Sequence, residues 1–143
     1  MAFIKYLVAI FATAVPATLA NPDCSPTGAG TCTLTIWGDK AMESIANPPW
    51  FPILRDRMDW KHAVISNNAC EDISGDVKPY QGYAMDSQLP YTVVFERLSP
   101  YGNYNSFRFC YAGSCYDGGA ACEIRSQTGD YWETNYCRRA FDC

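Results

Sequence analysis

Eight cysteines constrain the fold of this chain more than any other feature of its sequence. Three fall in FCYAGSCYDGGAAC, residues 109–122, and the full set is Cys24, Cys32, Cys70, Cys110, Cys115, Cys122, Cys137 and Cys143. A zinc site favours C-x2-C pairs or several histidines, whereas this chain has no C-x2-C and one histidine, His62. A catalytic cysteine would leave an unpaired thiol, and an even count leaves none. The sequence therefore predicts crosslinks and no metal site, with the pairing left open.

The first twenty residues, MAFIKYLVAIFATAVPATLA, have the pattern of a secretory signal peptide. Lys5 precedes an apolar stretch of about ten residues, and small residues near Ala20 suit a signal peptidase. A membrane anchor is the alternative, but a spanning helix needs about 20 apolar residues. We expect cleavage after Ala20, with Ala17 as a second position, and a mature single domain over residues 21–143. This product would be secreted to an extracellular, oxidising compartment.

The charge of the chain argues against two classes of partner. The formal net charge is −4, and the mature chain would be more acidic by the loss of Lys5. Such a protein lacks the excess of lysine and arginine that neutralises nucleic-acid phosphates or attracts anionic lipids. We expect no nucleic acid, no membrane span and no cofactor, and a monomeric chain.

The N-terminal half contains one clear strand and two helical patterns. Residues 31–37, TCTLTIW, alternate between two faces as a half-buried strand does. Residues 39–46 fit a short helix that Asp39 caps. Residues 52–65 fit a second helix, although their last part, WKHAVI, fits a strand equally well.

The C-terminal half has the pattern of antiparallel strands. Residues 91–98 and 104–111 flank turn residues and should form a hairpin. Residues 121–125 and 131–136 should form another, whereas residues 67–87 should be a long surface loop with one edge strand at most. We therefore expect an α+β fold, in which an antiparallel meander carries one or two short helices from the N-terminal half and is stapled by disulfides.

No recognisable catalytic set stands out. Acid–base pairs are conceivable among Glu71, Asp72, Asp56, Asp59 and Glu133. Neighbouring acidic residues on a surface are usually only solvated, however, and a lone histidine such as His62 is more often an ordinary surface or core residue than a catalyst. The motifs of serine hydrolases, zinc proteases and phosphate-binding loops are absent from the sequence. The sequence thus assigns no catalytic residue.

Aromatic residues, at 15% of the chain, are the richest remaining feature. Tyrosine and tryptophan anchor many protein interfaces, although small disulfide-rich domains also use tyrosine to cover their cores. Our candidates for binding are four tyrosines in or near predicted loops: Tyr80, Tyr83, Tyr101 and Tyr104. The last two lie in SPYGNYN, which we expect to be an exposed contact loop.

Several features together suggest a family. The signal peptide ends in ATLA, the cysteine count is even with one cysteine at position 143, and no enzyme motif is present. In these respects the whole chain resembles the small secreted cysteine-rich proteins of fungi, the effector or avirulence class, without matching a named subfamily. The resemblance implies delivery into plant tissue, where the protein would bind a host protein or cell-wall component and weaken defence.

The sequence is therefore compatible with three functions. The first is a non-enzymatic secreted binding protein of a plant pathogen, which we expect. The second is a small secreted hydrolase of ribonuclease or glycosidase type, which would need His62 or a carboxylate pair in one cleft. The third is an antimicrobial or killer toxin, which the acidic charge disfavours.

Alkylation of the native, unreduced protein tests the predicted crosslinks directly. Because the thiols are expected to be consumed in pairs, iodoacetamide should add no mass to the protein until a reductant is present. Intact-protein mass spectrometry measures this. Labelling of several cysteines before reduction would contradict the prediction and reopen metal or thiol chemistry.

Overall fold

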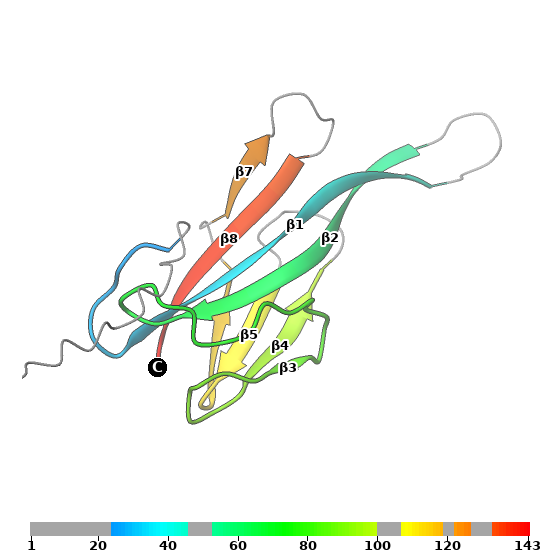
Figure 1. The fold of residues 1–143 in the computed structure, drawn as a ribbon. Helices are drawn as coiled ribbons and strands as arrows, with labels where there is room; N and C mark the ends of the chain where they lie inside the picture. The colour runs from blue at the N-terminus through cyan, green and yellow to red at the C-terminus, as the bar shows by residue number, and fades with distance from the viewer. Residues whose placement is uncertain (1–23, 46–52, 100–106, 119–121, 127–132) are drawn as a thin grey trace, which may run out of the picture.

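The computed structural model describes residues 24–45, 53–99, 107–118, 122–126 and 133–143 (Figure 1). Its strands in chain order are β1 (Thr31–Ile45), β2 (Ile53–Ser66), β3 (Ala84–Met85), β4 (Val93–Leu98), β5 (Phe107–Tyr111), β6 (Ser114–Asp117), β7 (Cys122–Ser126) and β8 (Glu133–Asp142). They form two antiparallel sheets, with strand order β2-β1-β8-β7 in the first and β3-β4-β5-β6 in the second. Within the described ranges, no helix is long and apolar enough to span a membrane.

The expected α+β class is wrong, because the two helical patterns lie in strands. Residues 39–45 continue β1, and residues 53–65 lie in β2, in agreement with the strand alternative for WKHAVI. The two strands are paired as far as Ile45 and Ile53. Helix-forming residues in β1 have a weak local preference, which the hydrogen bonds and packing of a long strand pair outweigh.

Two expected hairpins are present but belong to different sheets. β4 pairs with β5 in the second sheet, whereas β7 pairs with β8 in the first, where β8 also pairs with β1. The C-terminal half is therefore not one meander, because only β3 to β6 follow each other in one sheet. The predicted loop over residues 67–87 contains the short strand β3 and single bridges, among them Ala63 with Val77.

A shared apolar layer joins the two sheets. Leu34 and Ile36 of β1 belong to the same buried cluster as Phe95 and Phe107 of the second sheet, and all four are inaccessible to solvent. The ring of Trp60 in β2 meets that of Phe107 edge-on, with centroids 6.1 Å apart. Because each such side chain contributes about 1.5–3 kcal/mol on burial, this layer is the main source of stability.

Four disulfides confirm the predicted crosslinks. The pairs are Cys24–Cys70, Cys32–Cys143, Cys110–Cys115 and Cys122–Cys137. Cys32–Cys143 joins residues 111 positions apart, whereas Cys110–Cys115 spans five. On the chain-entropy account, the longer loop contributes about 5 kcal/mol and the shorter about 2 kcal/mol. On this account Cys32–Cys143, which joins the start of β1 to the end of β8, stabilises the fold more than any of the other three bridges.

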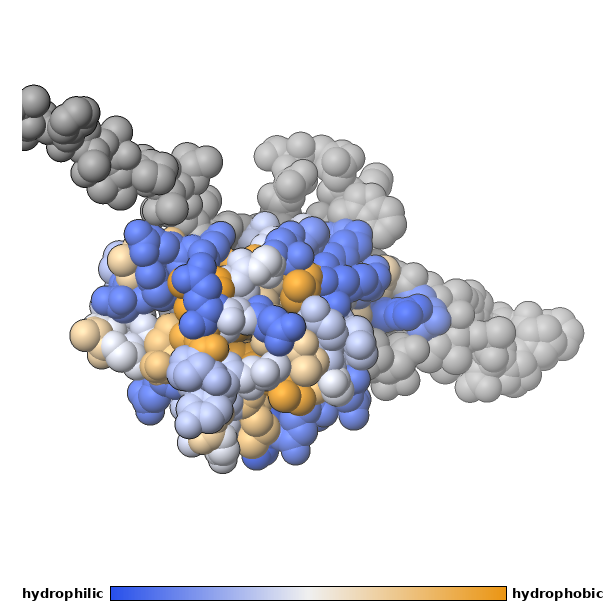
Figure 2. Space-filling view, turned by 60° about the horizontal axis from the view of Figure 1, so that its bottom comes forward, coloured by the Kyte–Doolittle hydropathy of each residue, from blue (hydrophilic) through white to orange (hydrophobic). Residues whose placement is uncertain are grey.

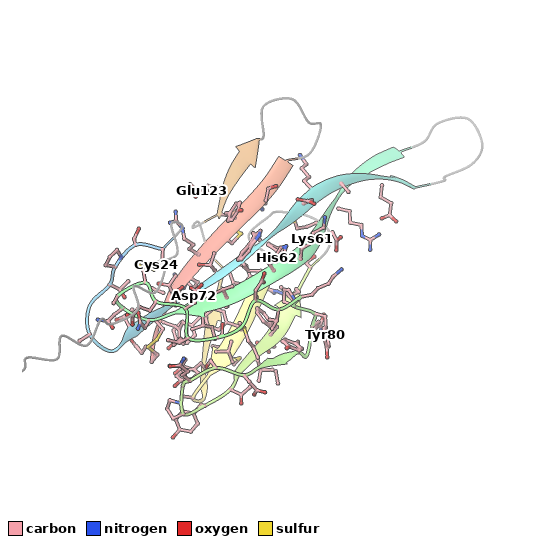
Figure 3. All side chains as sticks on the ribbon, viewed as in Figure 1. Cys24, Lys61, His62, Asp72, Tyr80 and Glu123 are labelled. Atoms are coloured by element: carbon pink, nitrogen blue, oxygen red, sulfur yellow. A yellow bond between two sulfur atoms is a disulfide. The ribbon has the colours of Figure 1, made fainter. Side chains whose placement is uncertain are left out.

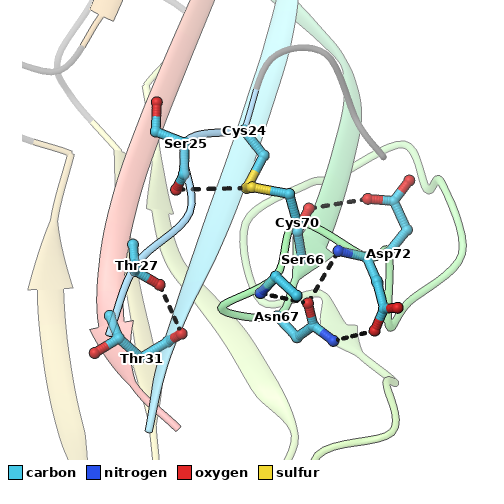
Figure 4. Close-up of a disulfide and its surroundings, with 10 residues drawn as sticks. Cys24, Ser25, Thr27, Thr31, Ser66, Asn67, Cys70 and Asp72 are labelled. Atoms are coloured by element: carbon cyan, nitrogen blue, oxygen red, sulfur yellow. Dashed lines mark hydrogen bonds between the residues drawn. A yellow bond between two sulfur atoms is a disulfide. The ribbon is translucent and has the colours of Figure 1, made fainter. Parts of the chain in front are cut away.

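The Cys24–Cys70 bridge fastens the segment before β1 to the turn after β2 (Figure 4). Asn67 shapes that turn, since its Oδ1 accepts hydrogen bonds from the backbone N–H groups of Ala69 and Glu71, each at 2.9 Å. Cys70 has a φ of 65°, a left-handed conformation that a non-glycine residue adopts only where its surroundings impose it. The bridge and the turn thus support each other.

Gly38 lies where the pairing of β1 and β2 shifts by one residue. A Cβ atom at this position would be 2.0 Å from the backbone oxygen of Asp59, a distance that no packing can accommodate. The close approach of the two strands at this bulge therefore requires glycine.

Replacing Gly38 with alanine should lower the free energy of unfolding by about 2–3 kcal/mol, because β1 and β2 must separate. Urea unfolding followed by tryptophan fluorescence measures this. Gly75→Ala is the matched control, since its Cβ would meet nothing within 4 Å, and its effect should stay within about 0.5 kcal/mol. Equal unfolding midpoints for the two variants would contradict this account of Gly38.

Candidate functional site

Three aromatic side chains form a row across the outer face of the first sheet. Trp37 of β1 is in register with His62 of β2 and with Tyr136 of β8. Since Ile36 points into the core, its neighbour Trp37 points outward. The ring centroids of Trp37 and His62 are 4.8 Å apart, and those of Trp37 and Tyr136 are 5.7 Å apart. We call these three residues the aromatic row.

The rings of the aromatic row are stacked on one another. The interplanar angle is 12° between Trp37 and His62 and 11° between Trp37 and Tyr136. Trp37 therefore has a neighbouring ring on each side, because β2 and β8 flank β1. Aromatic pairs of this kind contribute about 0.5–1.5 kcal/mol each beyond area burial. The row is thus a rigid feature that offers ring edges more than ring faces.

A bulge in β2 brings charged groups to one end of the row. The register passes from Trp37 with His62 to Gly38 with Trp60, so Lys61 is the extra residue. Asp39 and Asp59 come next and lie directly opposite each other, an arrangement that like charges disfavour. Lys61 Nζ forms an ion pair with Asp39 Oδ2, and each carboxylate thus obtains its own cation, because Lys78 Nζ lies 3.6 Å from Asp59 Oδ1.

Asp39 raises the pKa of Lys61 above its ordinary value, first through their hydrogen bond and then through its negative charge. A raised pKa in the folded state means that the pair stabilises the fold at every pH below the ordinary value of lysine. This contribution is lost only as the pH rises through the raised pKa, well into the alkaline range. Because Lys61 is exposed and Asp39 is only half-buried, the free energy involved is small.

Two further pairs complete the charges around the row. His62 Nδ1 lies 2.8 Å from Asp76 Oδ2, and Arg138 Nη2 lies 3.3 Å from Glu123 Oε1, with Glu123 in register with Tyr136. Figure 3 labels Lys61 and His62 on β2 and Glu123 on β7. We call the following seven residues the charged rim: Asp39, Asp59, Lys61, Asp76, Lys78, Glu123 and Arg138. Each of its carboxylates has a basic side chain beside it.

Two of the four predicted binding tyrosines are in contact with each other. The ring centroids of Tyr80 and Tyr83 are 5.0 Å apart, and Tyr80 is 62% exposed. They lie beside β3, away from the aromatic row, and Tyr101 and Tyr104 fall outside the described residues. In Figure 2, hydrophobic residues form small areas interleaved with polar ones instead of one broad patch. A binding role for these tyrosines stays a prediction.

The carboxylates considered for catalysis do not form an acid–base pair among the described side chains. Asn67 Nδ2 donates a hydrogen bond to Glu71 Oε2 at 2.7 Å, and Ser66 Oγ donates one to Asp72 Oδ1 at 2.9 Å. These two acids therefore hold the turn after β2. Asp59 belongs to the charged rim, and the side chains of Asp56 and Glu133 fall outside the described part of the chain.

Sequence reasoning missed the aromatic row for a clear reason. One signal was present, since the alternation in TCTLTIW places Trp37 with two threonines on the face opposite Leu34 and Ile36. A tryptophan on the polar face of a strand is a candidate contact residue, because tryptophan is enriched among the residues that dominate interfaces. The register of Trp37 with Tyr136, however, joins residues from opposite ends of the chain, which no local pattern reveals.

Comparison with known proteins does not assign a function to this site. No protein-family model, no curated protein and no solved structure matches the chain. The geometry of the aromatic row and the charged rim is therefore the basis for inferring their function.

Proposed function

We propose that the chain is a secreted, non-enzymatic binding protein of the effector type, which contacts a plant host component through the aromatic row and the charged rim. The observation that carries this proposal is the stacking of Trp37 between His62 and Tyr136 on an outer sheet face. A preorganised aromatic group loses little conformational entropy when it binds, which favours affinity. Recognition of the protein by the host as an avirulence factor belongs to the same proposal.

The arrangement around the row has the anatomy of a protein interface. Interfaces have an aromatic centre, where a few residues supply most of the binding energy, and a polar margin that excludes water. Here Trp37 and Tyr136 are partly buried in the centre, and ion pairs such as Lys78–Asp59 and Arg138–Glu123 surround them. Paired charges favour a partner with charges of both signs over a purely cationic or anionic one.

A protein is a better partner for this surface than a polysaccharide. Sugars stack on the open face of an aromatic ring, whereas both sides of Trp37 have a ring beside them. Ring edges and paired charges suit the mixed side chains of a protein surface instead. Of the two classes considered from the sequence, we therefore propose a host protein.

Secretion is supported by two independent features. The four disulfides of the structure are consistent with an extracellular protein. The signal-peptide pattern of residues 1–20 points the same way. Together they support a contact that is made outside the producing cell.

Replacing Tyr136 with alanine should weaken partner binding at least tenfold, because it removes one end of the aromatic row. The partner is first captured with the wild-type protein from host extracellular fluid and from host lysate in parallel. Its dissociation constant is then measured by surface plasmon resonance for the wild type, for Tyr136→Ala and for Lys61→Glu, which places a third negative charge beside Asp39 and Asp59.

Tyr80→Ala is the matched control, because it removes an exposed tyrosine beside β3 and leaves the first sheet unchanged. Its affinity should equal that of the wild type. Loss of binding in Tyr80→Ala with full binding in Tyr136→Ala would move the contact to the predicted tyrosines and refute the aromatic row. Circular dichroism and thermal unfolding confirm that each variant is folded.

One observation favours a small hydrolase as the second candidate. His62 Nδ1 lies at hydrogen-bond distance, 2.8 Å, from Asp76 Oδ2, an arrangement that orients an imidazole for acid–base work at its other nitrogen. The side chains are 41% and 50% exposed, however, so water is not excluded from the pair as catalysis favours. The binding protein therefore remains our first proposal.

Activity assays separate the two candidates. We expect the purified protein to hydrolyse neither RNA nor cell-wall oligosaccharides faster than its His62→Ala variant does. Turnover that is lost in His62→Ala and Asp76→Asn but kept in Asp72→Asn would establish the hydrolase. Asp72 is a suitable control because its carboxylate binds Ser66 in the nearby turn and not the histidine.

A further inference from the structure

The outer face of the second sheet holds two sulfur atoms beside a carboxylate. The Sγ atoms of Cys110 and Cys115 and a carboxylate oxygen of Glu96 all lie within 4.8 Å of one another. Cys110 and Cys115 are joined as a disulfide, and Glu96 Oε2 lies 3.7 Å from Cys110 Sγ. Among the described residues, this is the cluster of sulfur and carboxylate groups with the spacing of metal ligands.

The Cys110–Cys115 bridge is not needed to bring its two residues together. They are directly opposite each other in the β5–β6 pairing, one position before the pair Tyr111 and Ser114 that closes the turn. The turn residues Ala112 and Gly113 have φ angles of 49° and 83°, as a two-residue hairpin turn requires. The hairpin is therefore specified by its own turn and ladder, and the sulfur atoms stay close when the bridge is open.

Both cysteines of this bridge are accessible to solvent. Cys115 is exposed and Cys110 is half-buried. In each of the other three bridges one cysteine is buried, since Cys70, Cys32 and Cys137 are at most 3% exposed. Their partners Cys24 and Cys122 are half-buried and Cys143 is exposed, so only the Cys110–Cys115 bridge has both cysteines accessible. Exposed disulfides exchange with external thiols more readily than buried ones, because the attacking thiolate must reach a sulfur atom.

We propose that reduction of Cys110–Cys115 by a small thiol or a dithiol oxidoreductase creates a binding site for a thiophilic divalent cation such as Zn²⁺. The two thiolates and the carboxylate of Glu96 supply three ligands, and water supplies the fourth, in the tetrahedral arrangement that zinc favours. The site exists only in the reduced protein. A thiol-rich compartment therefore controls whether the metal is bound.

The reduction balances as ordinary thiol–disulfide exchange. An external thiolate attacks Cys115 Sγ, a mixed disulfide forms and Cys110 leaves as a thiolate. A second external thiolate attacks the external sulfur of the mixed disulfide and releases Cys115, so the external thiols are oxidised to a disulfide by two electrons. Metal binding then displaces any protons from the two thiols into solvent.

Arg108 positions the carboxylate and balances the charge of the site. Its Nε lies 2.6 Å from Glu96 Oε2 as an ion pair, and its Nη1 lies 3.8 Å from Asp117 Oδ2. Glu96 is thereby held beside the sulfur atoms before any metal arrives. Two thiolates and a carboxylate with a divalent cation carry one net negative charge, which the neighbouring guanidinium offsets.

Native reduction followed by cadmium titration tests the proposal. The folded protein is treated with limiting dithiothreitol, and one portion is alkylated and mapped by peptide mass spectrometry. We expect label on Cys110 and Cys115 before any other cysteine. A second portion, freed of reductant under nitrogen, is titrated with Cd²⁺, which should give a thiolate-to-metal charge-transfer band at one ion per chain and none in the oxidised protein.

Matched variants separate the site from general cysteine chemistry. The Cys110→Ser/Cys115→Ser double variant should keep the wild-type circular dichroism and lose the band. Glu96→Gln should weaken Cd²⁺ binding at least tenfold, whereas Glu123→Gln on the other sheet should leave it unchanged. The proposal is overturned if reduced protein gives no band, if other bridges open before Cys110–Cys115, or if the double variant binds Cd²⁺ as the wild type does.

Discussion

The pairing of β1 with a neighbour on each side is the constraint on which the rest of the structure depends. β1 is in register with β2 on one edge and with β8 on the other. Because side chains alternate along a strand, this register sends Leu34 and Ile36 into the core and Trp37 outward between two aromatic neighbours. A slip of one residue would exchange the two faces and destroy both the core and the aromatic row.

Both the disulfides and the apolar core stabilise this register. The Cys32–Cys143 bridge joins the start of β1 to the end of β8, where the long closed loop gives a disulfide its greatest effect. The core adds apolar burial but also carries a cost, because the buried amide of Asn135 has no hydrogen-bond partner within the described chain, which costs about 1–3 kcal/mol. Covalent ties help to offset such local costs in a small domain.

The sequence predicted the crosslinks and most of the strands correctly, but it did not predict the class of the fold. Paired cysteines and alternation such as TCTLTIW are local signals, and both led to correct predictions. The segment after Trp37 has no such alternation, and its helix-forming residues favoured the wrong element because its partner strand stabilises it from outside. The aromatic row was not predicted for a related reason. Trp37 and Tyr136 meet only because β1 pairs with β8, and these strands are far apart in the sequence, so the contact can be predicted only from the complete topology.

Different strands form the two outer faces of the molecule. The aromatic row depends on β1, β2 and β8, whereas Cys110 and Cys115 lie within a single hairpin of the other sheet. Opening a bridge that closes five residues releases little chain entropy, and the buried rings of Phe107 and Phe109 keep that hairpin on the core. A thiol-dependent change on the second sheet can therefore occur while the register of the first sheet, and the surface that it presents, stays as it is.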